Sequence, residues 1–289
     1  MSVDPATGPC AGDIVRSSDR LIAIVGNYGS GKTEVSVNLA IQLAAAGTRV
    51  QIADLDIVNP YFRCREARAL MEAHGIRVVV PPGAQVWADL PIILPEIRGM
   101  LHPPAGTLSI FDVGGDDAGA RSLAAFRTSL ADGEYELWQV INARRPFTDT
   151  VEGCLGMRKA IEGASRLAVT GLLVNSHLIE ETTAGDVLEG WRLAREVSAR
   201  TGLPIRCVAV MASLADAPEL AAIDAPLLRL RRYMLQPWLV WRDAASDGES
   251  ARVPAGLAST PNVRRAQAHQ PAVKSAAARH ASPTRERRP

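Results

Sequence analysis

The sequence is poor in cysteine, has no long apolar run and carries almost no net charge. Four cysteines occur in 289 residues, none in a Cys-x-x-Cys pair, which argues against a disulfide scaffold or a self-contained zinc or iron–sulfur site. No stretch approaches the roughly 18 apolar residues that a membrane-spanning helix requires. The net charge of +1 is too small to indicate a partner. We therefore expect a cytoplasmic protein whose function resides in local sites.

Short apolar runs rich in β-branched residues alternate with segments of helical periodicity. The expected strands are residues 21–25, 50–53, 76–80, 108–113, 137–141, 167–174 and 205–210. The expected helices are residues 35–46, 62–74, 118–130, 150–164 and 183–200. Strands that are apolar on both faces and alternate with helices are typical of a covered parallel sheet. The pattern predicts an α/β fold with a mostly parallel sheet of about seven strands and helices on both faces.

Composition divides the chain into three parts. Residues 1–19 predict a flexible lead-in, residues 20–242 one α/β domain, and residues 243–289 a disordered tail with eight basic and four acidic residues. Apolar residues in 227–241 fit one side of a helix, with arginines on the other side. That stripe can pack against the sheet or dock on acidic lipid, and we keep both alternatives.

A glycine-rich loop lies between the first expected strand and a helix: Gly26-Asn27-Tyr28-Gly29-Ser30-Gly31-Lys32-Thr33. Its spacing is that of a phosphate-binding P-loop, and we assign all eight residues to nucleotide binding. The backbone N–H groups and the helix N-terminus bind phosphate, Lys32 reaches the β and γ phosphates, and Thr33 binds Mg²⁺. Only three of the 32 basic residues are lysines, so Lys32 stands out. The loop predicts binding of a nucleoside triphosphate.

Acidic residues follow two expected strands. Asp54 and Asp56 end the second strand, and Asp112 ends the fourth, before two glycines. Carboxylates at the carboxyl edge of a parallel sheet, beside a phosphate loop, can hold Mg²⁺ or position the attacking water. We assign Asp56 to the water, as a catalytic residue with Lys32. Asp54 and Asp112 join Thr33 as candidate metal ligands.

Asn175 ends a later strand, and its amide offers a donor and an acceptor that suit a purine edge. A guanine would need an acceptor carboxylate three residues further along, where Leu178 stands. We therefore expect ATP to be preferred over GTP. We assign no role to His177 and interpret it as an exposed loop histidine.

In this order, these elements resemble the MinD/ParA/Mrp branch of P-loop ATPases, which includes the CobQ/CobB-type proteins. The resemblance covers about residues 20–240. It implies that strand 108–113 lies beside strand 21–25, that Asp56 orients the hydrolytic water, and that the protein is a nucleotide-dependent dimeric switch. Many of these relatives carry a lysine where this sequence has Asn27, so the loop is a variant without the extra lysine.

Two functional hypotheses follow. The first is a slow Mg²⁺-dependent ATPase that acts as a nucleotide-dependent switch on an unidentified protein partner, with a homodimer as a further option. The second is an ATP-dependent small-molecule kinase or ligase of the dethiobiotin-synthetase type, with residues 84–101 as a substrate wall. A third interpretation, contact with nucleic acid or membrane, rests on the basic tail and residues 227–241, and the first two are preferred.

Overall fold

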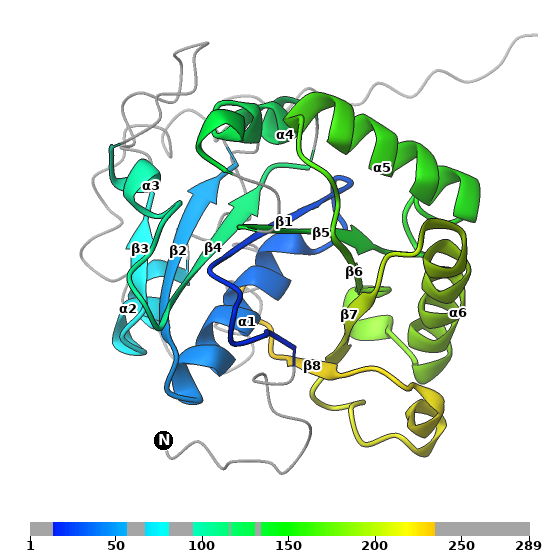
Figure 1. Cartoon of the computed structure of the whole chain (residues 1–289). Coiled ribbons are helices and arrows are strands. Elements are labelled where there is room, and N and C mark those ends of the chain that lie inside the picture. Colours follow the sequence, from blue (N-terminus) through cyan, green and yellow to red (C-terminus); the bar gives the residue numbers. More distant parts are fainter. Residues whose placement is uncertain (1–13, 57–66, 81–94, 116, 131–133, 235–289) are drawn as a thin grey trace, which may run out of the picture. The chain divides into compact units, whose positions relative to one another are not determined.

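The computed structural model describes residues 14–56, 67–80, 95–115, 117–130 and 134–234. Eight parallel strands form one sheet in the order β3-β2-β4-β1-β5-β6-β7-β8 (Figure 1). The strands are β1 (Leu21–Gly26), β2 (Arg49–Leu55), β3 (Arg77–Val79), β4 (Thr107–Val113), β5 (Glu136–Ile141), β6 (Gly171–Val174), β7 (Ile205–Met211) and β8 (Leu227–Leu230). The predicted fold class is confirmed, as is the neighbouring position of β1 and β4.

Helices cover both faces of the sheet, because its strands are apolar on both sides. The α-helices are α1 (Lys32–Ala45), α2 (Arg68–Ala73), α3 (Pro95–Gly99), α4 (Asp117–Ala124), α5 (Val151–Ser165) and α6 (Ala184–Thr201). One face packs against α1 and α2 around residues such as Ile24 and Leu39. The other face packs against α3, α4 and α5 around Phe111, and against α6 around Trp191. Short 3-10 turns, among them η4 (Ile179–Glu181), complete the described elements.

The helix expected within residues 227–241 is wrong for the described part of that range. Leu227–Leu230 form β8, which pairs in parallel with β7, and alternate residues, Leu228 and Leu230, are buried. In so short a segment the apolar residues fit both structures, since Leu227 and Leu230 have helical spacing and Leu228 and Leu230 have strand spacing. Pairing with β7 selects the strand. Residues 235–241 lie outside the described residues.

The free edge of β8 is paired by side chains of α1. Residues four apart on a helix are about 6 Å apart along its axis, and residues two apart on a strand are about 6.6 Å apart. Three polar residues of α1 therefore match three outward-facing backbone positions: Gln42 binds the carbonyl of Arg229, Asn38 the carbonyl and N–H of Arg231, and Glu34 the N–H of Tyr233. These contacts satisfy backbone groups at the edge of β8, at Arg229, and in the segment that follows it, at Arg231 and Tyr233.

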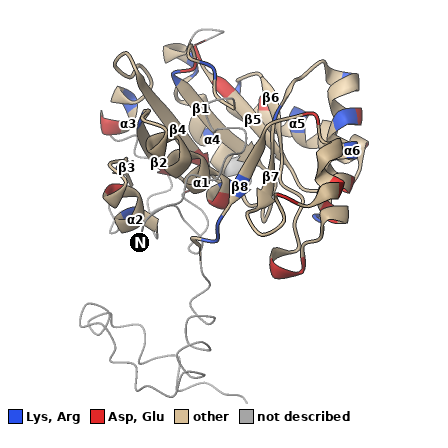
Figure 2. Cartoon of the chain, turned by 90° about the horizontal axis from the view of Figure 1, so that it is seen from below, with Lys and Arg blue, Asp and Glu red and all other residues tan. Residues whose placement is uncertain are grey.

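The segment that precedes β1 lies against the domain. Ile14 is buried in the core, and Arg16 forms ion pairs with Asp19 and Glu136. Within the described part of the expected lead-in, residues 14–19, Ile14 is thus packed in the core, whereas Arg16, Ser17 and Ser18 are exposed. Basic and acidic residues are interspersed over the described surface in Figure 2. No described helix is long and apolar enough to cross a membrane. The tail of residues 243–289 lies outside the described residues.

Candidate functional site

The glycine-rich loop joins β1 to α1 in a conformation that needs its glycines. Gly29 and Gly31 have φ angles of 70° and 83°, in the left-handed region that residues with side chains rarely adopt. Gly31 is the N-cap of α1, so the helix starts at Lys32. The first N–H groups of the helix and its positive dipole end face the place where a phosphate binds in a loop of this sequence.

Three side chains donate hydrogen bonds to carbonyl oxygens of this loop. The pairs are Lys32 Nζ with Asn27 O at 3.0 Å, Arg145 Nε with Gly29 O at 2.9 Å, and Asn175 Nδ2 with Ser30 O at 2.8 Å. Carbonyl oxygens that are held in this way leave the backbone N–H groups available to an anion. The Asn27 amide also donates to the carbonyl of Pro146 at 2.7 Å, so the loop after β5 supports the phosphate loop.

Asp112 lies beside the start of α1 and is completely enclosed. Its Oδ1 accepts a hydrogen bond from Ser36 at 3.2 Å, and Thr33 donates to the same carboxyl group. Burial and, to a smaller extent, the neighbouring carboxylates of Asp54 and Asp56 raise the pKa of Asp112 to about 7, against the opposing effects of the Thr33 hydrogen bond and of Lys32. Asp54 and Asp112 face each other across the pairing of β2 and β4.

Asp56, the residue assigned to the attacking water, lies at the same edge of the sheet. Its backbone N–H donates to Asp54 Oδ1 at 3.0 Å, and its own side chain is 7% exposed. A Cβ atom at Gly114 would lie 3.1 Å from Asp56 Oδ1, and one at Gly115 would lie 2.7 Å from Lys32 Nζ. The two glycines after β4 therefore touch both residues that we assign to catalysis.

The residues present fit a Mg²⁺ ion. Asp112 Oδ2 is buried and has no hydrogen-bond partner within the described residues, and a second oxygen ligand, the hydroxyl of Thr33, is bonded to the same carboxyl group. No cluster of three His, Cys, Asp or Glu side chains in the described ranges could hold a metal. Mg²⁺ is commonly bound by one or two protein oxygens together with phosphates and water, and Asp112 and Thr33 would supply the protein oxygens.

Asn175 lies where β6 ends and braces the phosphate loop. A Cβ atom at Gly31 would lie 2.3 Å from Asn175 Nδ2, so only glycine fits opposite this amide. The donor that we expected to contact a purine is thus bonded to Ser30 O. The amide oxygen is not used in that contact.

His177 is not the exposed loop histidine that we expected. Its Nδ1 accepts a hydrogen bond from the N–H of Ile179 at 3.4 Å, and its Nε2 is buried without a partner in the described structure. Burial lowers the pKa of His177 to about 4, with contributions from Arg145 and Arg232. The ring is therefore neutral at pH 7. No periodicity marks a buried loop histidine, so the sequence held no signal for it.

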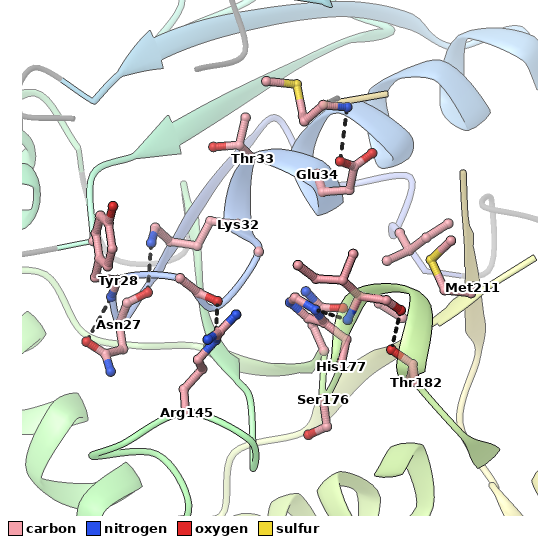
Figure 3. Close-up of a pocket in the computed structure, with 18 of the residues that line it drawn as sticks. Asn27, Tyr28, Lys32, Thr33, Glu34, Arg145, Ser176, His177, Thr182 and Met211 are labelled. Atoms are coloured by element: carbon pink, nitrogen blue, oxygen red, sulfur yellow. Dashed lines mark hydrogen bonds between the residues drawn. The ribbon is translucent and has the colours of Figure 1, made fainter. Parts of the chain in front are cut away.

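A cavity of about 550 Å³ begins at the phosphate loop and extends toward the ends of β6, β7 and β8 (Figure 3). Its polar end contains Lys32, Thr33, Asp56, Asn175 and His177. Its apolar lining comes from Ile179, Val187, Ala209, Val210, Met211, Leu230 and Met234. A pocket of this size, with a glycine-rich loop and polar side chains at one end and apolar walls at the other, suits a nucleotide.

The segment after β8 lines this cavity and is held there by hydrogen bonds to α1. Glu34, the residue after Thr33, accepts hydrogen bonds from the N–H groups of Tyr233 and Met234 at 2.7 and 3.2 Å. Burial raises the pKa of Glu34, whereas these N–H groups and Arg232 lower it. Arg232 in turn forms an ion pair with Glu180 of η4. The sequence gives no sign of this arrangement, because Glu34 and Tyr233 are 199 positions apart.

The parallel sheet, the loop and the acidic edge define a P-loop nucleotide-binding domain. A family model described as the CobQ/CobB/MinD/ParA nucleotide binding domain matches residues 22–187, more than half of the chain. The protein belongs to this family, and the expected membership is confirmed. A search of curated proteins finds no match.

Solved structures resemble this chain in part and at low sequence identity. The signal recognition particle 54 kDa protein from Aeropyrum pernix, in complex with GDP, is 19% identical, with a TM-score of 0.47 over 68% of this chain and 43% of that chain. FtsY from Thermotoga maritima is 22% identical, with a TM-score of 0.45 over 66% of this chain and 62% of that chain. This chain thus spans less than two thirds of either structure.

Proposed function

We propose that the protein is a slow Mg²⁺-dependent ATPase whose nucleotide state controls its grip on a protein partner. The observation that carries this proposal is the contact between the two glycines after β4 and the phosphate loop. Gly115 lies against Lys32 and the backbone of Tyr28, and Gly114 lies against Asp56. A γ-phosphate bound by Lys32 would lie next to this segment, so its presence or loss would change the segment's conformation, as in other nucleotide switches.

Each candidate residue has a role in that reaction. The loop from Gly26 to Thr33 holds the phosphates, and Lys32 neutralises charge on the transferred phosphoryl group. Mg²⁺, bound by Thr33 and Asp112, would neutralise charge on the β and γ phosphates. Asp56 orients the water for attack, with Asp54 holding its backbone N–H.

Exposed aromatic residues beside the loop support contact with a partner. Tyr28 is 66% exposed and Phe147 is 71% exposed, and both line the cavity. Their two loops are joined by the hydrogen bond from Asn27 to Pro146. Large exposed aromatic residues are typical anchors of protein interfaces, and a second copy of the chain is one such partner.

Binding and hydrolysis are tested separately. Lys32→Ala is expected to weaken Mg²⁺-ATP binding at least about 10-fold, because the γ-phosphate loses its mobile cation. Lys159→Ala, which removes an exposed lysine of α5, is the matched control and should bind normally. Asp56→Asn should bind ATP but hydrolyse it at least about 10-fold more slowly in single turnover. Equal ATP affinity in the two lysine variants would overturn the site assignment.

The switch is distinguished from the small-molecule enzyme by whether ATP turnover depends on a protein partner or on an added metabolite. Basal hydrolysis without a metabolite, stimulated by a protein that co-purifies from the native cell, supports the switch. Turnover that requires an added metabolite contradicts it and favours a kinase or ligase. Most of the substrate wall expected for that enzyme, residues 84–94, lies outside the described residues.

A further inference from the structure

We propose that His177 is a base-reading residue that donates a hydrogen bond to N7 of adenine, while the amide oxygen of Asn175 accepts from the adenine amino group. This inference rests on the proposed function, because it places the base of a bound ATP in the cavity. It assigns a role to a side chain for which the sequence indicated none.

The tautomer of His177 is set by its neighbour. Because Nδ1 accepts the N–H of Ile179 at 3.4 Å, the proton of the neutral ring resides on Nε2. Nε2 is buried and has no partner among the described residues. A buried donor without a partner costs about 1–3 kcal/mol, and His177 lines the cavity. A ligand acceptor is the missing partner.

Asn175 presents the complementary group. Its orientation is fixed because Nδ2 donates to Ser30 O at 2.8 Å, which turns the amide oxygen away from the phosphate loop. That oxygen accepts no hydrogen bond from the described residues. A Cβ atom at Gly31 would lie 2.3 Å from Asn175 Nδ2 and 3.1 Å from His177 Nε2. Both side chains therefore lie beside Gly31, and both line the same cavity.

The pair discriminates between the purines. Adenine presents an acceptor at N7 beside a donor at its 6-amino group, whereas guanine presents acceptors at both N7 and O6. A His donor next to an Asn acceptor matches the adenine edge. Guanine would place O6 against the amide oxygen of Asn175, leaving one buried acceptor unpaired. The arrangement thus selects adenine without the carboxylate that guanine recognition requires.

The test removes the hydrogen-bond acceptor N7 from the nucleotide and the donor Nε2 of His177 from the protein. ATP, 7-deaza-ATP and GTP are measured with Mg²⁺ by calorimetry on the full chain, as wild type, His177→Phe and His74→Phe. 7-Deaza-ATP has a C–H group in place of N7, so wild type should bind it about 3- to 10-fold more weakly than ATP. His177→Phe should bind both equally, and His74→Phe, which alters an exposed histidine of the α2 C-cap, should behave as wild type.

Each outcome decides one proposal. Equal affinity of wild type for ATP and 7-deaza-ATP would overturn the role of His177 and leave ATP binding intact. The same conclusion follows if His177→Phe keeps the wild-type preference for N7. GTP binding tighter than ATP would overturn the pairing with Asn175. A wild-type protein that binds no ATP would overturn the proposed function itself. The wild-type comparison stands even if the phenylalanine variant does not fold.

Discussion

Gly115→Ala is a sharp test of the contact between the segment that follows β4 and the glycine-rich loop. The added methyl group would lie 2.7 Å from Lys32 Nζ, 2.8 Å from Tyr28 Cα and 2.9 Å from Tyr28 N. Lys32 can move its flexible end, but the backbone of Tyr28 moves only with the whole loop. The substitution therefore displaces either the phosphate loop or the segment that follows β4.

The magnitude follows from the cost of overpacking. Inserting a methyl group into a tightly packed site costs about 1–3 kcal/mol. The empty protein can relieve part of that strain by shifting the loop, whereas a bound triphosphate requires the loop in place. If most of the cost appears on binding, ATP affinity falls about 10- to 100-fold. Gly156→Ala is the matched control, because a Cβ atom there meets nothing within 4 Å.

The assay measures Mg²⁺-ATP binding by calorimetry and stability by urea unfolding in both variants. Gly156 lies inside α5, so its alanine variant should gain up to about 1 kcal/mol of stability and bind ATP as wild type does. Wild-type ATP affinity in Gly115→Ala would refute the reasoning, since it would show that the two segments separate when the nucleotide binds.

Two further predictions concern stability. Asn38 is 1% exposed and forms hydrogen bonds with both the N–H and the carbonyl of Arg231. Asn38→Ala should therefore lower the free energy of unfolding by about 2–4 kcal/mol. Gln42→Ala removes one hydrogen bond to the same segment, and an equal or larger loss in that variant would contradict the prediction. Because the pKa of His177 falls from 6.5 to about 4 on folding, the unfolded chain binds the proton more tightly, and stability is full above pH 6.5 and declines toward pH 4. That loss amounts to about 3 kcal/mol and should shrink in His177→Phe when urea unfolding is compared at pH 7 and 4.5.

The glycine-rich loop and the strand and helix that flank it could be predicted from the sequence because their pattern is local. Gly31, Lys32 and Thr33 are consecutive, and the strand and helix that flank them have their own periodicity. Asp56 and Asp112 were found by a simple topological rule, since the carboxyl ends of parallel strands meet at one edge of the sheet. The pairing of β2 with β4 then places Asp54, which lies close to Asp56 in the sequence, opposite Asp112.

The base side of the cavity could not be predicted, because its contacts join distant parts of the chain. The bond from Asn175 to Ser30 spans 145 positions, and that from Glu34 to Tyr233 spans 199. His177 received its low pKa from burial and from arginines on other elements. Such effects leave no trace in spacing or composition. β8 was missed for the same reason, since its four residues acquire strand geometry from β7 and α1.

The helix after the phosphate loop serves two purposes, which follow from where its polar residues fall. Its first turn carries Lys32 and Thr33, which line the cavity, and the same turn carries Glu34, which accepts hydrogen bonds from the N–H groups of Tyr233 and Met234. Further polar residues of the helix continue that contact along β8. A rigid helix has a fixed rise per residue, so a displacement of its first turn cannot be absorbed between these contacts. The glycine-rich loop and the segment that follows β8 are therefore connected through α1, by side-chain hydrogen bonds rather than by strand pairing.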